Sequence, residues 1–199
     1  NEPKFSTNLR ITVISNLLEL MIVLNESFTN YFQTIDIDAI FINIENGDVK
    51  MLLEQQIAVQ RDSVKSSVNE MLAYMIFELL CMANPYDGKK TLVKFPLLTK
   101  KSIEIINKEN KDFIFADNDN GISKYIGKDT LARWNALPNI IRNALEDNLD
   151  LNRNAITYEL NDWVFPIRNL RDLLVYVNGY FRFCNPLESN QVLFFKVDE

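Results

Sequence analysis

The feature that most constrains the fold is an apolar stretch near the N-terminus that repeats at helical spacing on two faces. One stripe runs from Leu9 to Phe28 in steps of three and four residues. A second stripe lies on another face of the same element and consists of Ile11, Ile14, Leu18 and Ile22. Because a helix that is apolar on two faces must be covered on two sides, this pattern predicts the central helix of a bundle.

The same residues predict the ends and the core contacts of this helix. Ser6 or Thr7 carries a side chain that suits the cap of the first turn. The helix is expected to continue as far as Phe32. Leu17 and Leu20 are predicted to be fully buried between helices.

Two further elements complete a predicted helical bundle over residues 1–88. The segment 37–44 alternates Ile and Phe, as a strand does, but is interpreted as a short helix that ends in a turn at 45–48. A long helix is expected to begin at Asp48. Its second half, residues 71–82, is almost wholly apolar and is predicted to be deeply buried.

The expected order of a long, a short and a long helix around a central rod resembles one unit of the armadillo or HEAT type. The resemblance covers residues 6–84 and rests on the helical pattern. No similar segment recurs downstream, so an array of repeats is not expected.

After Gly88 the pattern changes to a mixed part, residues 89–199, with helices and a few short strands. The strands are expected at 91–98, 112–115, 155–160 and 192–197. The helices are expected at 129–145, interrupted by Pro138, and at 166–181. The fold class is therefore mainly α (α+β overall), with the N-terminal helical bundle and the mixed part packed as one unit.

Composition excludes several kinds of catalytic site. The 199 residues include no histidine, which removes Ser-His-Asp and Cys-His nucleophiles and His-ligated metals. The five glycines do not recur at dinucleotide-binding spacing. Cys81 and Cys184 lie in apolar surroundings and are interpreted as small buried hydrophobes in a reducing compartment. We therefore expect neither an enzyme nor a bound cofactor or metal.

Charge and hydropathy narrow the expected partners. The net charge of −6 disfavours non-specific contact with a nucleic-acid backbone. No uninterrupted apolar run reaches the ~18 residues of a membrane span, so no contact with a membrane is expected. The chain begins at Asn1 and ends just after the apolar run 192–197, which we interpret as a piece of a longer intracellular protein, cytoplasmic or nuclear.

A candidate binding surface lies on the helix predicted for 166–181. Its buried face is expected to consist of Ile167, Leu170, Leu174, Val177 and Phe181. Tyr176 lies well off that stripe, and tyrosine and arginine often dominate binding energy. Tyr176 and Tyr180, with Arg168 and Arg171, are therefore the candidate partner-binding residues.

The sequence as a whole predicts a non-catalytic protein–protein interaction or scaffold domain, which binds another protein or other regions of its own full-length chain. One alternative is a DNA- or chromatin-associated domain, because residues 121–145 resemble a helix-turn-helix with Lys128, Thr130 and Arg133 at the start of the recognition helix. A weaker alternative is a metal-dependent nuclease. Its candidate residues are Asp112, Glu159 and Lys196.

Overall fold

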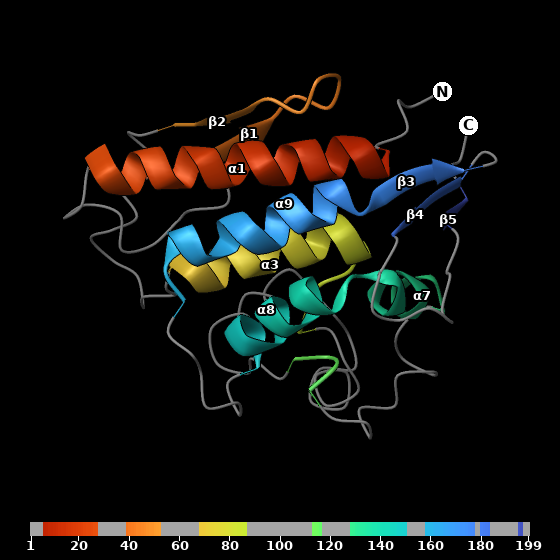
Figure 1. Ribbon diagram of the computed structural model, residues 1–199. Helices are drawn as coiled ribbons and strands as arrows, with labels where there is room; N and C mark the ends of the chain where they lie inside the picture. The colour runs from red at the N-terminus through yellow and green to blue at the C-terminus, as the bar shows by residue number, and fades with distance from the viewer. Residues whose placement is uncertain are drawn as a thin grey trace, which may run out of the picture.

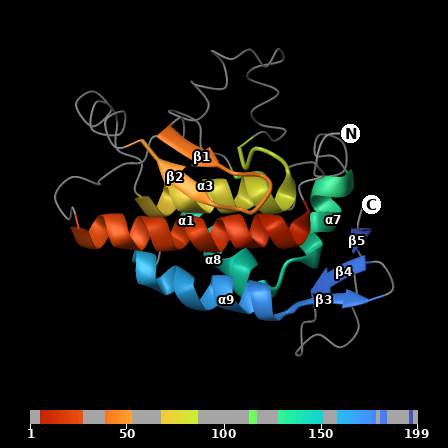
Figure 2. The same cartoon turned by 90° about the horizontal axis from the view of Figure 1, so that it is seen from above.

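A long apolar helix, α1 (Thr7–Ser27), lies across the middle of the computed structural model (Figures 1 and 2). The structure describes residues 6–27, 39–52, 68–86, 113–116, 128–150, 158–177, 180–183 and 195–196, and beyond Leu174 it describes the backbone alone. The predicted cap is confirmed: the Ser6 Oγ accepts a hydrogen bond of 3.2 Å from the Leu9 N–H. This bond satisfies one of the first-turn donors that a helix leaves unpaired.

The burial of α1 confirms that it is a central element. Its buried residues are Ile11, Val13, Ile14, Leu17, Leu18, Met21 and Leu24. Leu17 is fully buried, as predicted. Leu20 is only half-buried, so its predicted full burial is wrong. Because the helix turns by about 100° per residue, Leu20 lies at the edge of the arc that the buried residues define.

By length and composition alone, α1 is the one helix in the described residues that could cross a membrane, although a buried core helix meets the same criterion. It meets this criterion despite Asn16 in its centre. The Asn16 Nδ2 donates a hydrogen bond of 2.9 Å to the Gly47 carbonyl, which joins α1 to a neighbouring turn. The absence of a membrane span stays a prediction.

The short helix predicted for 37–44 is wrong over the described residues 39–44, because this segment contains a strand. β1 (Ile40–Ile42) pairs antiparallel with β2 (Val49–Met51), so the helix expected from Asp48 is also wrong at its start. Burial alternates along both strands, as on a half-buried sheet. The turn between them contains Gly47 at a φ of 82°, a left-handed conformation that favours glycine.

The apolar segment at 71–82 is confirmed as a deeply buried helix. α3 (Val68–Cys81) buries seven residues in the core: Leu72, Ala73, Met75, Ile76, Phe77, Leu80 and Cys81. The helix ends where Met82 adopts a φ of 56°. The Met82 side chain is 52% exposed, so the buried run stops at Cys81.

The helix predicted at 129–145 forms two pieces that break at Pro138, as expected. These are α7 (Lys128–Ala136) and α8 (Asn139–Leu149), with Pro138 in the N-cap position of α8. Trp134 of α7 stacks on Phe115 with 4.6 Å between ring centroids. Residues 113–116 form a turn, so the strand predicted at 112–115 is wrong over its described part. Phe113 and Phe115 both pack with Trp134 and with Phe77 of α3.

The C-terminal part consists of a helix followed by strands. A 3-10 turn, η2 (Leu160–Trp163), leads into α9 (Val164–Asp172). Three strands follow in the antiparallel order β3 (Leu174–Val177), β4 (Tyr180–Phe183) and β5 (Phe195–Lys196). The helix predicted to reach Phe181 therefore ends at Asp172. The strand predicted at 155–160 does not form over its described residues 158–160, and β5 lies within the one predicted at 192–197.

The described elements share one apolar core in a mainly α fold. In Figure 2, α1 lies between α3 and α9, and Figure 1 shows α8 below α9 and α3. The core cluster contains residues of α1, α3, α7, α8, η2 and α9. The hairpin β1–β2 lies over α1 and α3 on the side away from α8 (Figures 1 and 2). The strand predicted at 91–98 and the loop at 117–127 lie outside the described residues.

Candidate functional site

The exposed face of α9 carries the two arginines singled out from the sequence. Arg168 and Arg171 are both exposed, three residues apart on this helix. Phe165, three residues before Arg168, is 64% exposed. Because residues three apart are neighbours on a helix surface, the aromatic ring and the two guanidinium groups follow one another along one side of α9. The sequence pattern did not single out Phe165.

The two candidate tyrosines do not lie on the same helix as the arginines. Tyr176 is on β3 and Tyr180 is on β4. In the backbone register of this pair, Tyr176 is opposite Phe181 and Val177 is opposite Tyr180. The predicted helical face that joined Tyr176 to Arg168 and Arg171 is therefore wrong. The signal that could have revealed the strands is Asn178-Gly179 between two β-branched and aromatic runs, a common hairpin sequence.

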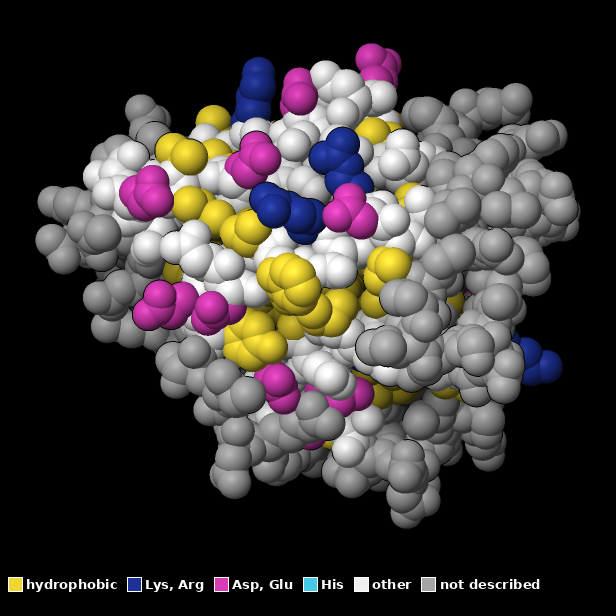
Figure 3. Space-filling model, in the orientation of Figure 1, with side chains coloured by type: hydrophobic (Ala, Val, Ile, Leu, Met, Phe, Trp, Pro, Cys, Tyr) yellow, Lys and Arg dark blue, Asp and Glu magenta, His cyan; other side chains and the backbone are white. Residues whose placement is uncertain are grey.

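Figure 3 shows that hydrophobic side chains gather over the region where α9, α3 and α8 lie in Figure 1. Basic and acidic side chains border this region. Partly buried apolar residues of these elements that pack against the core include Val164, Leu173 and Ile140. This face thus combines an apolar centre with charged edges, the composition typical of a surface that binds another protein.

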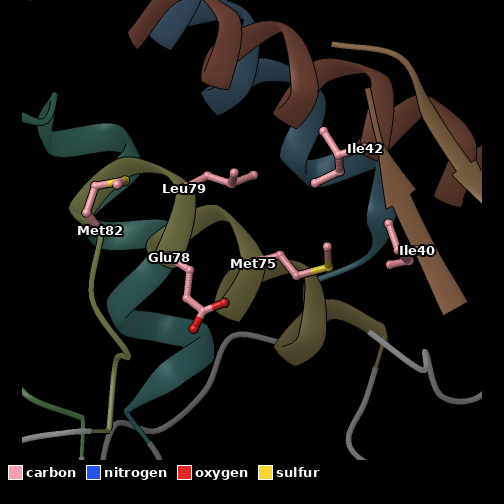
Figure 4. Close-up of a pocket in the computed structure, with 6 residues that line it drawn as sticks. All are labelled: Ile40, Ile42, Met75, Glu78, Leu79 and Met82. Carbon is pink, nitrogen blue, oxygen red and sulfur yellow. The ribbon is translucent and has the colours of Figure 1, made fainter. Parts of the chain in front are cut away.

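A second candidate site is a pocket between β1 and α3 (Figure 4). Its volume is about 200 Å³, and its described lining residues are Ile40, Ile42, Met75, Glu78, Leu79 and Met82. In Figure 4 the side chains of Ile40 and Ile42 come from the hairpin, those of Met75, Glu78 and Leu79 come from α3, and Met82 follows the end of α3. Among these described lining residues, all are apolar except Glu78, which brings one carboxylate.

Within the described strands, one edge of β1 has no partner strand. Asn43 N–H donates to the Asp48 carbonyl at 2.8 Å, and Leu52 N–H donates to the Ala39 carbonyl at 2.9 Å. Because hydrogen-bonded residues alternate in an antiparallel pair, the N–H and C=O groups of Ile40 and Ile42 point away from β2. Among the described strands, β1 pairs with β2 alone.

Glu78 supplies the only ionisable side chain among the described residues of this pocket. Its Oε1 accepts a hydrogen bond of 2.9 Å from the Tyr74 hydroxyl, one turn earlier on α3. Burial raises the pKa of Glu78 above its ordinary value, and the Tyr74 hydrogen bond acts in the opposite direction. No cation pairs with this carboxylate in the part of the chain that the structure describes.

The described part of the helix-turn-helix segment differs in exposure among its three candidate residues. Thr130 is buried and Arg133 is half-buried, whereas Lys128 is exposed. Burial, and secondly the nearby charge of Arg133, lower the pKa of Arg10 on α1, so the Arg133 side chain lies close to α1. Residues 121–127 lie outside the described ranges. Of the three residues expected to read DNA, Thr130 is therefore not presented on an open surface.

No described contact brings the three nuclease candidates together. Glu159 is exposed and forms a reciprocal capping box with Asp162 at η2, with the Glu159 N–H donating to Asp162 Oδ2 at 2.8 Å. Asp112 and the side chain of Lys196 lie outside the described residues. Across the described ranges, no group of three Cys, Asp or Glu residues is placed to hold a metal ion.

Cys81 is a free thiol, fully buried at the end of α3. Burial raises the pKa of this thiol well above its ordinary value, and the charge of Arg133 lowers it by a smaller amount. The interpretation of Cys81 as a buried hydrophobe is confirmed, while the side chain of Cys184 lies outside the described residues. A thiol that stays protonated is a poor nucleophile.

No protein-family model matches the chain, and comparisons with curated proteins and with solved structures also found no match. Within the described residues, the two candidate sites are the α9 surface and the β1–α3 pocket.

Proposed function

We propose that this chain is a non-catalytic protein–protein interaction or scaffold domain that acts inside the cell, in the cytoplasm or nucleus. The observation that carries the proposal is the exposure of Phe165 beside Arg168 and Arg171 on α9. The Phe165 ring is 64% exposed, so much of its apolar surface contacts water. A partner that covers the ring removes this surface from water, which favours binding. Aromatic and arginine side chains are also the ones most enriched among residues that dominate binding energy.

We propose a single module and not an array of repeats. The armadillo- or HEAT-type unit that residues 6–84 resemble needs a short helix between two long ones, and the β1–β2 hairpin occupies that place in the fold. The free thiol of Cys81 agrees with a reducing compartment. The binding surface proposed here is the side of α9 that carries Phe165, Arg168 and Arg171, in place of a helical face that includes Tyr176 and Tyr180.

Site-specific photo-crosslinking tests this function. Benzoylphenylalanine replaces Phe165 in the full chain, and in a control variant it replaces Val23, which is 57% exposed on α1. In extracts of cells that make the protein, a discrete crosslinked partner is expected from position 165 and not from position 23. Adding Arg168→Glu to the first variant should reduce the yield. Equal crosslinking at both positions, or none at 165, contradicts the proposal.

A further inference from the structure

We propose that the pocket between β1 and α3 binds an extended segment of a partner protein that pairs with the open edge of β1 and places apolar side chains and one lysine or arginine in the pocket. The inference rests on the proposed function, because it assigns a second contact surface and a chemistry to the partner. It involves residues that the α9 surface does not use.

The backbone of the hairpin favours an extended ligand. The N–H and C=O groups of Ile40 and Ile42 point away from β2, and they have no partner strand among the described residues. An open strand edge is a template on which another chain adds a strand, with affinity from main-chain hydrogen bonds. The same two residues line the pocket, so a strand added there lies directly beside it.

The side chains of the pocket favour apolar anchors at alternate positions. Side chains of a strand alternate between faces, so every second residue of an added strand points toward α3. Met75 and Leu79 form the α3 side of the pocket, and Met82 lies at one end of it (Figure 4). An apolar cavity of about 150 Å³ holds a benzene molecule. The pocket, at about 200 Å³, therefore has room for one or two apolar side chains.

Charge complementarity identifies the remaining side chain. Glu78 brings a carboxylate to this apolar pocket, with the Tyr74 hydroxyl as its hydrogen-bond partner and no described cation beside it. A lysine or arginine can lay its apolar stem along Leu79 and Met82 and bring its charged group to the carboxylate. The hairpin turn adds the exposed acids Glu45 and Asp48, which attract a cation to the same end of the molecule.

A second copy of the chain fits this pocket less well than a basic partner. Each copy carries a net charge of −6, so two copies repel one another. If β1 paired with β1 of a second copy, the strand that entered the pocket would be Ile40–Ile42, which holds no basic residue. Lys50 lies on β2 opposite Phe41, on the exposed face of the hairpin.

A phage-displayed library of random ten-residue peptides is the probe for this pocket. Selection on the purified full chain is expected to enrich sequences with alternating apolar residues and one lysine or arginine. Selection on Glu78→Gln should enrich the apolar pattern without the basic residue. No enrichment over the starting library, or a basic preference that survives Glu78→Gln, overturns the proposal.

The affinity of one selected lysine peptide gives the quantitative test, measured by fluorescence anisotropy. Glu78→Gln should weaken binding by about ten-fold or more, because one charge-assisted contact is lost. It should not weaken the binding of the same peptide with norleucine in place of lysine, because that side chain forms no ion pair with Glu78. Phe41→Ser is the matched control, because Phe41 lies on the same strand but on its exposed face. Loss of binding in Phe41→Ser with full binding in Glu78→Gln overturns the proposal.

Two results separate this inference from the proposed function. A crosslinked partner at position 165 together with no peptide selection on the pocket overturns the inference and leaves the proposed function intact. Sedimentation of the full chain provides the other separation. A dimer that Ile42→Asp converts to monomer shows that a second copy occupies the edge of β1, which overturns the assignment of a basic partner segment.

Discussion

Replacing Leu17 with alanine tests the packing around α1 most directly. Leu17 is 0% exposed and belongs to the core cluster that α1 shares with α3 and α9. The change removes three carbon atoms from this core. At about 0.8 kcal/mol for each buried methylene, the lost transfer free energy is about 2.4 kcal/mol. The cavity that remains adds to this cost, so the free energy of unfolding should fall by about 2–5 kcal/mol.

Urea unfolding followed by circular dichroism measures this loss, with Val23→Ala on the same helix as the control. Val23 is 57% exposed, so its truncation should change the free energy of unfolding by no more than about 0.5 kcal/mol. For a chain of this size, the Leu17 variant should also melt about 4–20 °C below the wild type. A loss below about 0.5 kcal/mol for Leu17→Ala, or equal losses for the two variants, refutes the central position of α1.

Three further predictions concern the turn, the thiol and the carboxylate. Gly47→Ala should cost about 1–3 kcal/mol in urea unfolding, because alanine is strained at a φ of 82° and its Cβ would lie 3.0 Å from Thr12 Cγ2; unchanged stability contradicts the turn geometry. Iodoacetamide should label Cys81 in the native protein no faster than the protein unfolds, as measured by peptide mass spectrometry, and rapid labelling contradicts its burial. Because burial raises the folded-state pKa of Glu78, the stability that its protonated form contributes is present below the unfolded value and is lost as pH rises through the folded one. The unfolding free energy of Glu78→Gln should therefore increase relative to that of the wild type as the pH rises from about 4, the ordinary range of a glutamate, and a constant difference argues against the burial of the carboxylate.

The elements that the sequence predicted well are those whose helical spacing extends over several turns. α1 and the second half of the predicted helix at 48–82 carry apolar residues at steps of three and four, and both are buried helices. Pro138 marked the break between α7 and α8, because proline lacks the N–H that a continuous helix needs. Over several turns, the apolar spacing fits the helical period of 3.6 residues and does not fit the strand period of two.

The strands were missed because their runs are short. Ile40–Ile42 and Leu174–Val177 contain three and four residues, too few to separate a period of two from a period of 3.6. The better signal was the pair Asn-Gly, which separates the paired strands at Asn46-Gly47 and at Asn178-Gly179 and also occurs at Asn120-Gly121. The first of these glycines has the positive φ that such turns use. At 174–183 the apolar spacing also fits a helix that continues from α9. The structure has the paired strands β3 and β4 there.

The candidate surfaces could be predicted only in part. Arg168 and Arg171 are exposed, as their positions off the apolar stripe of α9 indicate. The β1–α3 pocket joins residues more than thirty positions apart in the chain, and two of its six described lining residues lie on a strand that was interpreted as a helix. Spacing within one element carries no information about which elements meet, so no local pattern could place Ile42 beside Leu79.

Glu78 is the residue that links the fold to the proposed partner. It is the one Asp, Glu, Lys or Arg among the residues 71–82, and its burial makes the charged form less favourable in the folded protein. The fold does not need this charge, because a glutamine could accept the same hydrogen bond from the Tyr74 hydroxyl. The carboxylate therefore lowers stability at neutral pH, while a cation that enters the pocket offsets that loss in the complex. A buried charge that lowers the stability of the free protein, and that a cation of the partner offsets, is typical of a recognition site.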